Sequence, residues 1–233
     1  MEKQLKSIEA SYDKAIEAGR KGIDLYKNLP EHITSDPDYS IFQSWITDNA
    51  NQGSGCPQIL DYLSPGSNMN FIDLGCCLNL MFRGYDQWPS VYHGVDISSE
   101  TIRLLSELTE KREWQIGTLY CGSVHQTPFE TGYFDIGACI GVLEYFEKDF
   151  VTQAIIEAHR IIKPYGKFVL DIPDIENPNC RIMKLIEEHL ERPCKFNMTS
   201  QEFEDAMQKY FKIERIVKSD VEPMVLYFLS CKK

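Results

Sequence analysis

The hydrophobic pattern of the first 66 residues has the period of helices. Residues 1 to 28 place apolar side chains three or four positions apart among charged ones, which predicts an amphipathic helix weakened by Gly19 and Gly22. The segment Asp36-Pro37-Asp38 favours the start of a second helix, and Ile59 to Leu63 favours a third. The apolar face of the second helix would comprise Phe42, Trp45 and Ile46. A loop is expected at 51–55, and residues 1–66 are therefore predicted to form an N-terminal helical cap.

From Asn70 onward, short apolar runs alternate with amphipathic stretches. The expected strands are 71–74, 91–97, 118–121, 133–140 and 167–172, and the helices between them are 78–85, 99–111 and 149–162. The turn Lys163-Pro164-Tyr165-Gly166 would separate the last helix from the fifth strand. Strands and helices that alternate with short connections predict an α/β fold with a doubly wound, mostly parallel sheet.

The C-terminal part has a different order of elements. Helices are expected at 179–190 and 200–210, the second beginning near Thr199 or Ser200 with Glu202 or Glu204 close by. Two strands follow at 211–219 and 224–231, and residues 220–223 between them suit only a hairpin. The sheet would thus have seven strands and end in an antiparallel hairpin, within a core domain of residues 67–233 that carries a helical insertion at about 176–210.

Two of the expected strands end in acidic residues. Asp73 and Gly75 close the run from Met69, and Asp96 closes the run from Val91. Carboxyl ends of parallel strands are where such sheets bind ligands, and a glycine there lets the backbone approach the ligand closely. A carboxylate at the end of the second strand can accept hydrogen bonds from two ribose hydroxyls. The pattern predicts a pocket for a nucleoside-containing cofactor.

Composition narrows the classes of partner. A net charge of −11 and a pI near 5.0 oppose binding to nucleic acid or to anionic membranes, so a small molecule is the expected partner. The eight cysteines include no C-x-x-C pair, which argues against a structural zinc site, and we expect no bound metal. No signal-peptide pattern and no run of about 20 apolar residues occurs, so a soluble, cytoplasmic protein is expected. The sequence carries no signal for an oligomeric state.

Five motifs in order resemble the class I S-adenosylmethionine-dependent methyltransferases, a seven-stranded Rossmann-like family that ends in an antiparallel hairpin. The similarity runs from about Asn70 to the C-terminus. The motifs are Phe71-Ile-Asp-Leu-Gly-Cys76, Gly94-Val-Asp-Ile-Ser98, Gly122-Ser-Val-His-Gln-Thr-Pro-Phe129, Phe134 to Glu144, and Ala158 to Gly166. Each motif alone is a weak signal, but five in register are specific.

The resemblance implies roles for individual residues. Asp73, Gly75, Cys76 and Ile140 would lie near the methionine part of S-adenosylmethionine, and Asp96 would hold the ribose. Ile97, Ser123 and Val124 would contact the adenine. The product of the reaction would be S-adenosylhomocysteine.

This chain departs from the family pattern at three positions. Cys77 and Asn79 stand where the family usually has further glycines, and Ser123 replaces an aspartate. Side chains in the glycine motif occupy space near the ligand, and a neutral hydroxyl bonds the adenine amine more weakly than a carboxylate does. These departures imply a shifted cofactor or a lower affinity.

The resemblance predicts methyl transfer to an unidentified, small acceptor molecule, with Glu144, Tyr145 and His125 as candidate catalytic residues. Such a reaction demands alignment, exclusion of water and, for some acceptors, removal of a proton. A second hypothesis is a protein that binds S-adenosylmethionine as a sensor or partner subunit without transferring methyl. A third is a nicotinamide-dependent dehydrogenase, which is disfavoured because the G-x-G-x-x-G turn is absent.

Overall fold

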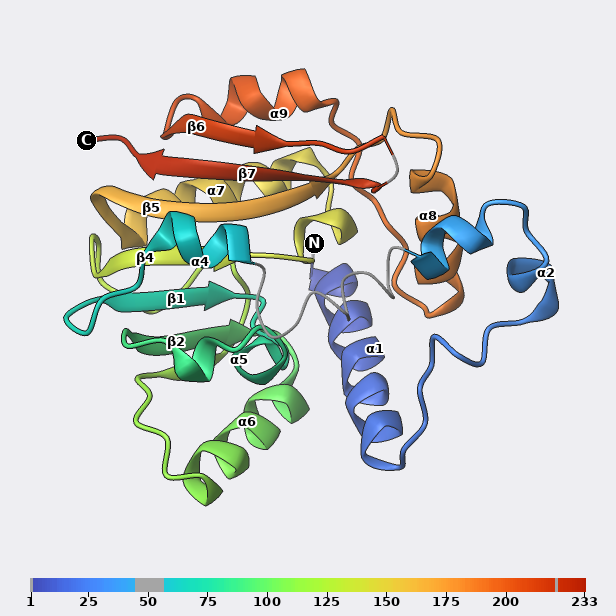
Figure 1. The fold of residues 1–233 in the computed structure, drawn as a ribbon, viewed down its shortest axis with the longest axis horizontal. Helices are drawn as coiled ribbons and strands as arrows, with labels where there is room; N and C mark the ends of the chain where they lie inside the picture. Colours follow the sequence, from blue (N-terminus) through green and yellow to red (C-terminus); the bar gives the residue numbers. More distant parts are fainter. Residues whose placement is uncertain (1, 45–56, 221) are drawn as a thin grey trace.

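The computed structural model describes residues 2–44, 57–220 and 222–233, which are built around one twisted sheet (Figure 1). Its strands lie in the order β3-β2-β1-β4-β5-β7-β6. Their bounds are β1 Asn70–Leu74, β2 Val91–Asp96, β3 Leu119–Cys121, β4 Phe134–Cys139, β5 Ile162–Pro173, β6 Phe211–Val217 and β7 Met224–Cys231. The first five strands pair in parallel, whereas β7 pairs antiparallel with both β5 and β6. The predicted mostly parallel, seven-stranded sheet with a C-terminal hairpin is confirmed.

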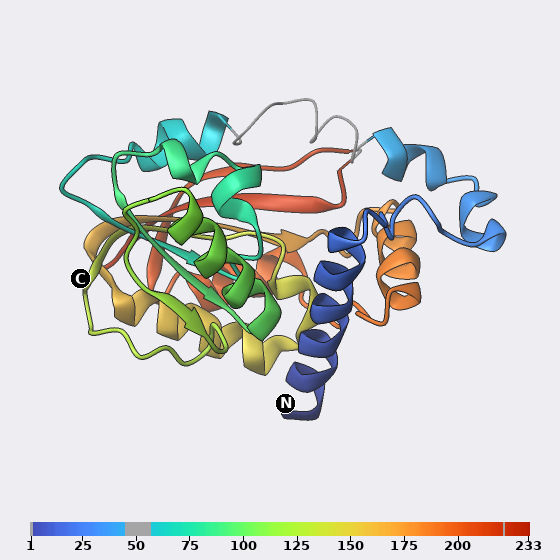
Figure 2. The same cartoon turned by 90° about the horizontal axis from the view of Figure 1, so that it is seen from below.

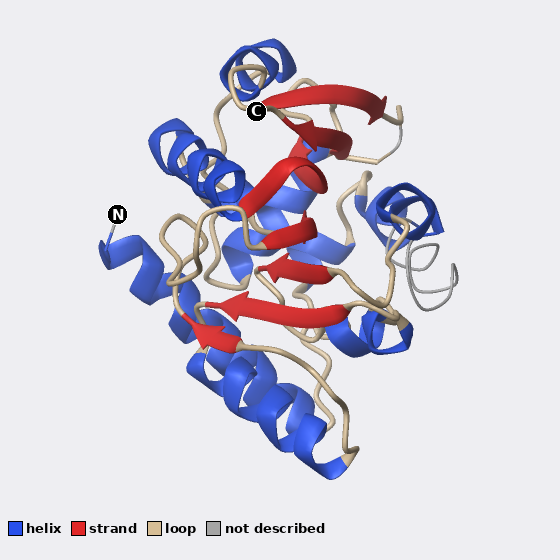
Figure 3. Ribbon diagram, turned by 90° about the vertical axis from the view of Figure 1, so that its left-hand side faces the viewer, coloured by secondary structure: helices blue, strands red, loops and turns tan. Residues whose placement is uncertain are grey.

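Helices cover both faces of this sheet (Figure 3). They are α1 Glu2–Arg20, α2 Glu31–Thr34, α4 Pro57–Leu63, α5 Asn79–Phe82, α6 Ser99–Lys111, α7 Lys148–Ile161, α8 Cys180–His189 and α9 Ser200–Met207. Short 3-10 helices follow at Tyr85–Gln87 (η1) and Leu143–Tyr145 (η2). Most of these bounds agree with the predicted ones to within two residues, because the local hydrophobic period specifies them.

The two sheet faces build two hydrophobic clusters. On one face, α7 and α9 cover β-strand side chains such as Ile72 and Phe168. On the other face, α4 and α6 cover neighbours such as Phe71 and Val169. Consecutive strand residues therefore belong to different clusters, as the alternation of a strand requires. Burying each side chain of this size contributes about 1.5–3 kcal/mol, so both faces hold the sheet in place.

Helix α1 stands against the carboxyl ends of the parallel strands (Figures 1 and 2). The prediction of one helix through residue 28 is wrong beyond Arg20, because the backbone turns at Gly22, which has φ 74°. This left-handed conformation favours glycine and terminates the helix. The segment after Gly22 then runs toward α8.

A separate small cluster joins the N-terminal segment to the insertion. Leu29, Ile33 and Phe42 pack against Ile182 and Ile186 of α8. Arg181 forms ion pairs with Asp36 and Asp38 of the same segment. Residues 39–44 are helical as expected, whereas the predicted positions of Trp45, Ile46 and the loop 51–55 lie outside the described residues. The division into a cap and a core domain remains a prediction.

Two connections differ from the predicted ones. The expected turn at 163–166 is a bulge inside β5, because Phe134 pairs with Ile162 and Ile136 already pairs with Lys167. Parallel pairing on both sides of the bulge extends the strand beyond what the turn-forming residues suggest. The expected helix at 78–85 is limited to α5, since Gly84 adopts φ 66° and a 3-10 turn follows.

The predicted order of elements at the end of the chain is confirmed, although α9 ends at Met207 and β6 at Val217, before the predicted ends at 210 and 219. Helix α9 begins with a capping box in which Thr199 and Glu202 satisfy each other's backbone groups. The hairpin of β6 and β7 follows, with a register shift between Ile213 and Arg215. Capping and hairpin signals are local, which is why the sequence reveals them.

Candidate active site

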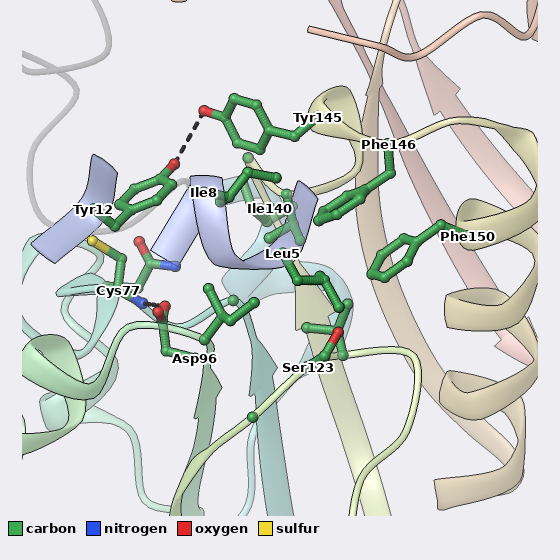
Figure 4. Close-up of a pocket in the computed structure, with 17 residues that line it drawn as sticks. Leu5, Ile8, Tyr12, Cys77, Asp96, Ser123, Ile140, Tyr145, Phe146 and Phe150 are labelled. Atoms are coloured by element: carbon green, nitrogen blue, oxygen red, sulfur yellow. Dashed lines mark hydrogen bonds between the residues drawn. The ribbon is translucent and has the colours of Figure 1, made fainter. Parts of the chain in front are cut away.

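A cavity of about 190 Å³ opens at the carboxyl ends of β1, β2 and β4, beneath α1 (Figure 4). Side chains from α1 form its roof, and loops that follow the strands form its floor. The roof comprises Leu5, Ile8 and Tyr12; the floor and walls include Gly75, Cys77, Asn79, Asp96, Ile97, Ser123, Val124, Ile140, Gly141, Val142, Tyr145, Phe146 and Phe150. The cavity lies where a doubly wound sheet binds its ligands.

Asp96 is the charged group of this cavity. Its Oδ2 accepts a hydrogen bond from the Cys77 N–H at 2.7 Å, and its Oδ1 accepts one from the Ser98 N–H at 2.9 Å. Burial raises the pKa of Asp96 to about 6, against the effect of these backbone hydrogen bonds. Each carboxylate oxygen keeps a further lone pair, so both oxygens can accept from ligand hydroxyls.

The loop after β1 approaches the cavity through two residues with positive φ. Gly75 has φ 76°, and a Cβ there would lie 2.1 Å from Cγ2 of Val142. Only glycine fits this position. Cys77 has φ 38°, although it carries a side chain. The conformation explains why the related family usually places glycine at this position, and why the cysteine is strained there.

Asp73 and Cys76 lie beneath the cavity and are not part of its lining. The carboxylate of Asp73 is fully buried and accepts a hydrogen bond from the Tyr92 hydroxyl at 3.0 Å. Burial raises the pKa of Asp73 to about 7. The Cys76 side chain packs so near Gly94 that a Cβ on this glycine would meet Sγ at 2.9 Å. Their expected contacts with a cofactor remain predictions.

The opposite wall is apolar apart from one hydroxyl. Ile97, Val124 and Ile140 belong to the lining, and their expected contacts with an adenine or a methionine chain remain predictions. The Ser123 hydroxyl shares a hydrogen bond of 2.6 Å with Nδ1 of His125. His125 itself is not part of the lining; its ring packs 4.9 Å from the Phe150 ring, and burial lowers its pKa.

The sequence reasoning missed the residues of α1 that cover this cavity. Tyr12 holds the helix there, because its hydroxyl lies 3.0 Å from the Tyr145 hydroxyl (Figure 4). Gln4 also donates to the backbone oxygen of Tyr145. At the other end of α1, Arg20 lies within 4 Å of Glu100 and Glu107 on α6. The apolar stripe of α1 signals a buried face, but does not say what that face covers.

A second cavity of about 280 Å³ adjoins the first. The two share Tyr12, Ile140, Gly141 and Tyr145 as a common wall. The remaining lining is aromatic, apolar or charged: Tyr26, Phe42, Arg83, Glu144, Asp171, Met183, Glu187 and Met224. The predicted pair Glu144 and Tyr145 therefore faces this second cavity, and Tyr145 faces both.

Three buried carboxylates meet the second cavity. Glu187 accepts from the hydroxyls of Tyr26 at 2.9 Å and Tyr145 at 3.1 Å, and pairs with Arg192 at 3.0 Å. Asp171 accepts from the Gly141 N–H at 2.8 Å. The approach of Asp171 and Glu187 was not predicted, because β5 and α8 meet η2 only in the folded chain.

No helix in the described part of the chain is both long and apolar enough to span a membrane. Within the same residues, no three His, Cys, Asp or Glu side chains are arranged to hold a metal ion. Seven cysteines lie in the described residues, and all of them are free thiols.

Comparison with known proteins supports a specific family. Residues 72–170 match the model of a methyltransferase domain. A search of curated proteins found no match. The structure of the PH0226 protein from Pyrococcus horikoshii OT3 is similar, with 22% identity and a TM-score of 0.61, and the match covers 88% of this chain and 100% of that one.

Two further structures share the fold. Geranyl diphosphate C-methyltransferase from Streptomyces coelicolor A3(2), solved with Mg²⁺, geranyl-S-thiolodiphosphate and S-adenosyl-L-homocysteine, is 16% identical. Its match has a TM-score of 0.61 and covers 75% of this chain and 74% of that one. A putative methyltransferase from Bacillus halodurans C-125 is 12% identical, with a TM-score of 0.59 and coverage of 76% and 97%. At these identities the similarity concerns the fold.

The domain match, the strand order and the antiparallel β7 agree with one another. They confirm the resemblance inferred from the five motifs, and favour a transferase over the dehydrogenase alternative. Residues 72–170 therefore form a methyltransferase domain, and the sheet around them has the class I, S-adenosylmethionine-dependent fold.

Proposed function

We propose that this protein transfers the methyl group of S-adenosylmethionine to a small acceptor molecule held in the second cavity. The observation that carries the proposal is the common wall of the two cavities at the end of β4. A cofactor in the first cavity and an acceptor in the second would meet across Ile140, Gly141 and Tyr145. Such adjacency is what an in-line displacement requires.

The residues of the first cavity fit the cofactor. Asp96 offers two acceptor oxygens for the ribose hydroxyls, and Ile97 and Val124 offer an apolar slot for the adenine. Gly75 leaves room for the backbone to approach the methionine part. The bound cofactor supplies a methyl group that its sulfonium activates. The chain's own contribution is then to align the reactants and exclude water.

A small acceptor suits the enclosure of the second cavity. Helix α1, the segment around Phe42 and helix α8 surround it. The net charge of −11 further disfavours a nucleic-acid acceptor. The similar C-methyltransferase also acts on a small molecule, as its bound geranyl-S-thiolodiphosphate indicates. A cytoplasmic location remains a prediction.

Isothermal titration with S-adenosylmethionine and S-adenosylhomocysteine tests the cofactor site. We expect both to bind, and we expect Asp96→Ala to weaken each at least tenfold, since hydrogen bonds to a charged group contribute about 1.5–3 kcal/mol. Asp61→Ala, which changes an exposed acid on α4, is the matched control and should bind normally. The proposal fails if neither ligand binds at millimolar concentration or if Asp96→Ala binds both with unchanged affinity.

A second candidate is a protein that binds the cofactor without transferring methyl. The observation that favours it is Cys77, whose side chain occupies the lining in a strained conformation, with Asn79 beside it. Cofactor binding without turnover over a broad panel of acceptors would support this candidate. Copurification of S-adenosylhomocysteine, the product of transfer, would support the enzyme.

A further inference from the structure

We propose that the acceptor is a primary or secondary amine, which the second cavity binds as an ammonium ion beside the carboxylates of Glu144 and Asp171. The inference rests on the proposed function, and it specifies the chemical class of the acceptor. It depends on three features of the second cavity: its charge, one carboxylate oxygen that has no hydrogen-bond partner in the described part of the chain, and its aromatic lining.

The charge of the lining is negative. Glu144, Asp171 and Glu187 contribute three carboxylates, whereas Arg83 contributes one guanidinium. Arg192 lies behind Glu187 and forms an ion pair with it. Glu187 is thereby satisfied, with Arg192 and the two tyrosine hydroxyls as partners. The charge available to a ligand therefore comes from Glu144 and Asp171.

Glu144 is the side chain with which we expect a ligand to form a hydrogen bond. It is only 7% exposed, and its Oε2 has no hydrogen-bond partner among the described residues. Its backbone oxygen is already used by the N–H groups of Lys195 and Phe196, which hold η2 in place. A buried carboxylate oxygen without a donor is destabilising, and a donor from a bound molecule would remove that cost.

Asp171 lies close enough to act with Glu144. Gly141 connects them, because its N–H donates to Asp171 at 2.8 Å and a Cβ on it would lie 3.8 Å from Oε1 of Glu144. Burial and the neighbouring Asp171 raise the pKa of Glu144 well above its usual value. An ammonium ion bound beside Glu144 would favour its ionised form, because a nearby opposite charge opposes the effect of burial on the pKa.

The aromatic lining suits the same kind of ligand. Tyr12, Tyr26, Phe42 and Tyr145 face the cavity from four different segments of the chain. Aromatic faces attract cations through the negative charge density of the ring face. An anionic acceptor would instead meet buried carboxylates, and a neutral alcohol would leave their charge uncompensated. Amines are the class that satisfies both the carboxylates and the rings.

Methylation of a bound ammonium ion requires the loss of one proton and the transfer of one methyl group. Glu144 takes one proton from the bound ammonium, which frees the nitrogen lone pair. This pair forms the new N–C bond as the S–C bond to the methyl group breaks, and the electron pair of that bond stays on sulfur. The product is a methylated ammonium ion beside Asp171, together with S-adenosylhomocysteine, and the proton on Glu144 passes to solvent. The raised pKa of Glu144 makes it an effective base for this step.

Three probes that share a phenyl ring and are similar in size test the inference on the full chain saturated with S-adenosylhomocysteine: 2-phenylethylamine, 2-phenylethanol and phenylacetate. We expect titration calorimetry to show that the amine binds at least tenfold more tightly than the alcohol, and that phenylacetate does not bind. Glu144→Gln should remove this preference, and Asp171→Asn should reduce it. Glu147→Gln, which changes an exposed acid three residues away, should keep it. With S-adenosylmethionine in place of the product, mass spectrometry should detect N-methyl-2-phenylethylamine.

The outcomes separate the two proposals. If S-adenosylhomocysteine binds in an Asp96-dependent way but the amine binds no better than the alcohol, the inference is wrong and the proposed function stands. The inference is also wrong if Glu144→Gln keeps both the amine preference and normal cofactor affinity. If S-adenosylhomocysteine does not bind to the wild-type chain, the proposed function itself fails. Cofactor affinity also shows whether each variant is folded.

Discussion

At the residue scale, Cys77 combines a strained backbone with a position in the cofactor cavity. Its φ of 38° lies in the left-handed region, which costs a residue with a Cβ roughly 1–2 kcal/mol. Its N–H nevertheless donates to Asp96, so the strained turn helps to orient the acid expected to bind the ribose. The sequence shows the departure from glycine, but only the structure shows that the backbone still adopts the conformation of glycine.

Replacing this side chain should improve cofactor binding. In Cys77→Gly the strain disappears and the side chain leaves the cavity, so we expect the affinity for S-adenosylhomocysteine to rise about threefold to tenfold. The greater flexibility of glycine in the unfolded chain offsets about 0.5–1 kcal/mol of the stability gained. Titration calorimetry measures the affinity, and urea unfolding measures the stability.

Cys77→Ser is the matched control, because it removes the thiol but keeps a side chain of similar size. It should bind the cofactor with an affinity near that of the wild type. Equal affinities for the glycine and serine variants would show that neither backbone strain nor side-chain volume limits binding.

At the scale of elements, α1 links the cofactor cavity to the rest of the cap. Leu5 and Ile8 cover the cavity from one face of the helix. Ser11, on the same helix, donates to the backbone oxygen of Leu190 just after α8. Helix α1 also contacts α6 through the ion pairs of Arg20 with Glu100 at 3.8 Å and with Glu107 at 3.9 Å. These pairs are solvent-exposed and hence weak. A ligand in the cavity beneath α1 would add contacts with Leu5 and Ile8 of this helix.

Cofactor binding should therefore slow the opening of α1. We expect S-adenosylhomocysteine to reduce amide hydrogen exchange in residues 2–20 at least tenfold, since bound ligand adds apolar contacts with Leu5 and Ile8. Helix α9 contributes no residue to the lining of the cofactor cavity and serves as the internal control, with little change expected. Exchange in α1 that stays the same at saturating ligand would contradict its role as a roof.

At the scale of the whole molecule, buried titratable groups make stability depend on pH. Asp73 has a raised pKa of about 7 because it is buried, and His93 has a lowered pKa of about 4 for the same reason. Since the folded state keeps a proton on Asp73 longer than the unfolded state does, this residue stabilises the fold fully below about pH 4 and loses its contribution as the pH rises to 7. His93 acts in the opposite direction, because stability falls as the pH drops from about 6.5 to 4.

Comparison of Asp73→Asn with the wild type separates the effect of the Asp73 carboxyl group on stability from the effects of other titratable groups. The amide oxygen can still accept from the Tyr92 hydroxyl, and it does not ionise. Between pH 4.5 and pH 8, we expect the wild-type free energy of unfolding to fall by roughly 2–4 kcal/mol more than that of the variant. Urea unfolding at several pH values measures both. Parallel pH profiles for the two proteins would show that Asp73 does not titrate as its burial implies.

Local sequence patterns specify the order of strands and helices along the chain, the C-terminal hairpin, and the positions of Gly75 and Asp96 at strand ends. These features depend on hydrophobic period, capping and turn residues, which act between neighbours in the chain. Long-range packing places α1 over the cofactor cavity and puts Cys77 in its lining, with Asp73 and Cys76 outside that lining. It also brings Glu144 and Asp171 to one cavity. Such contacts join residues far apart in sequence, and they arise from how helices pack on the sheet, which no local pattern encodes.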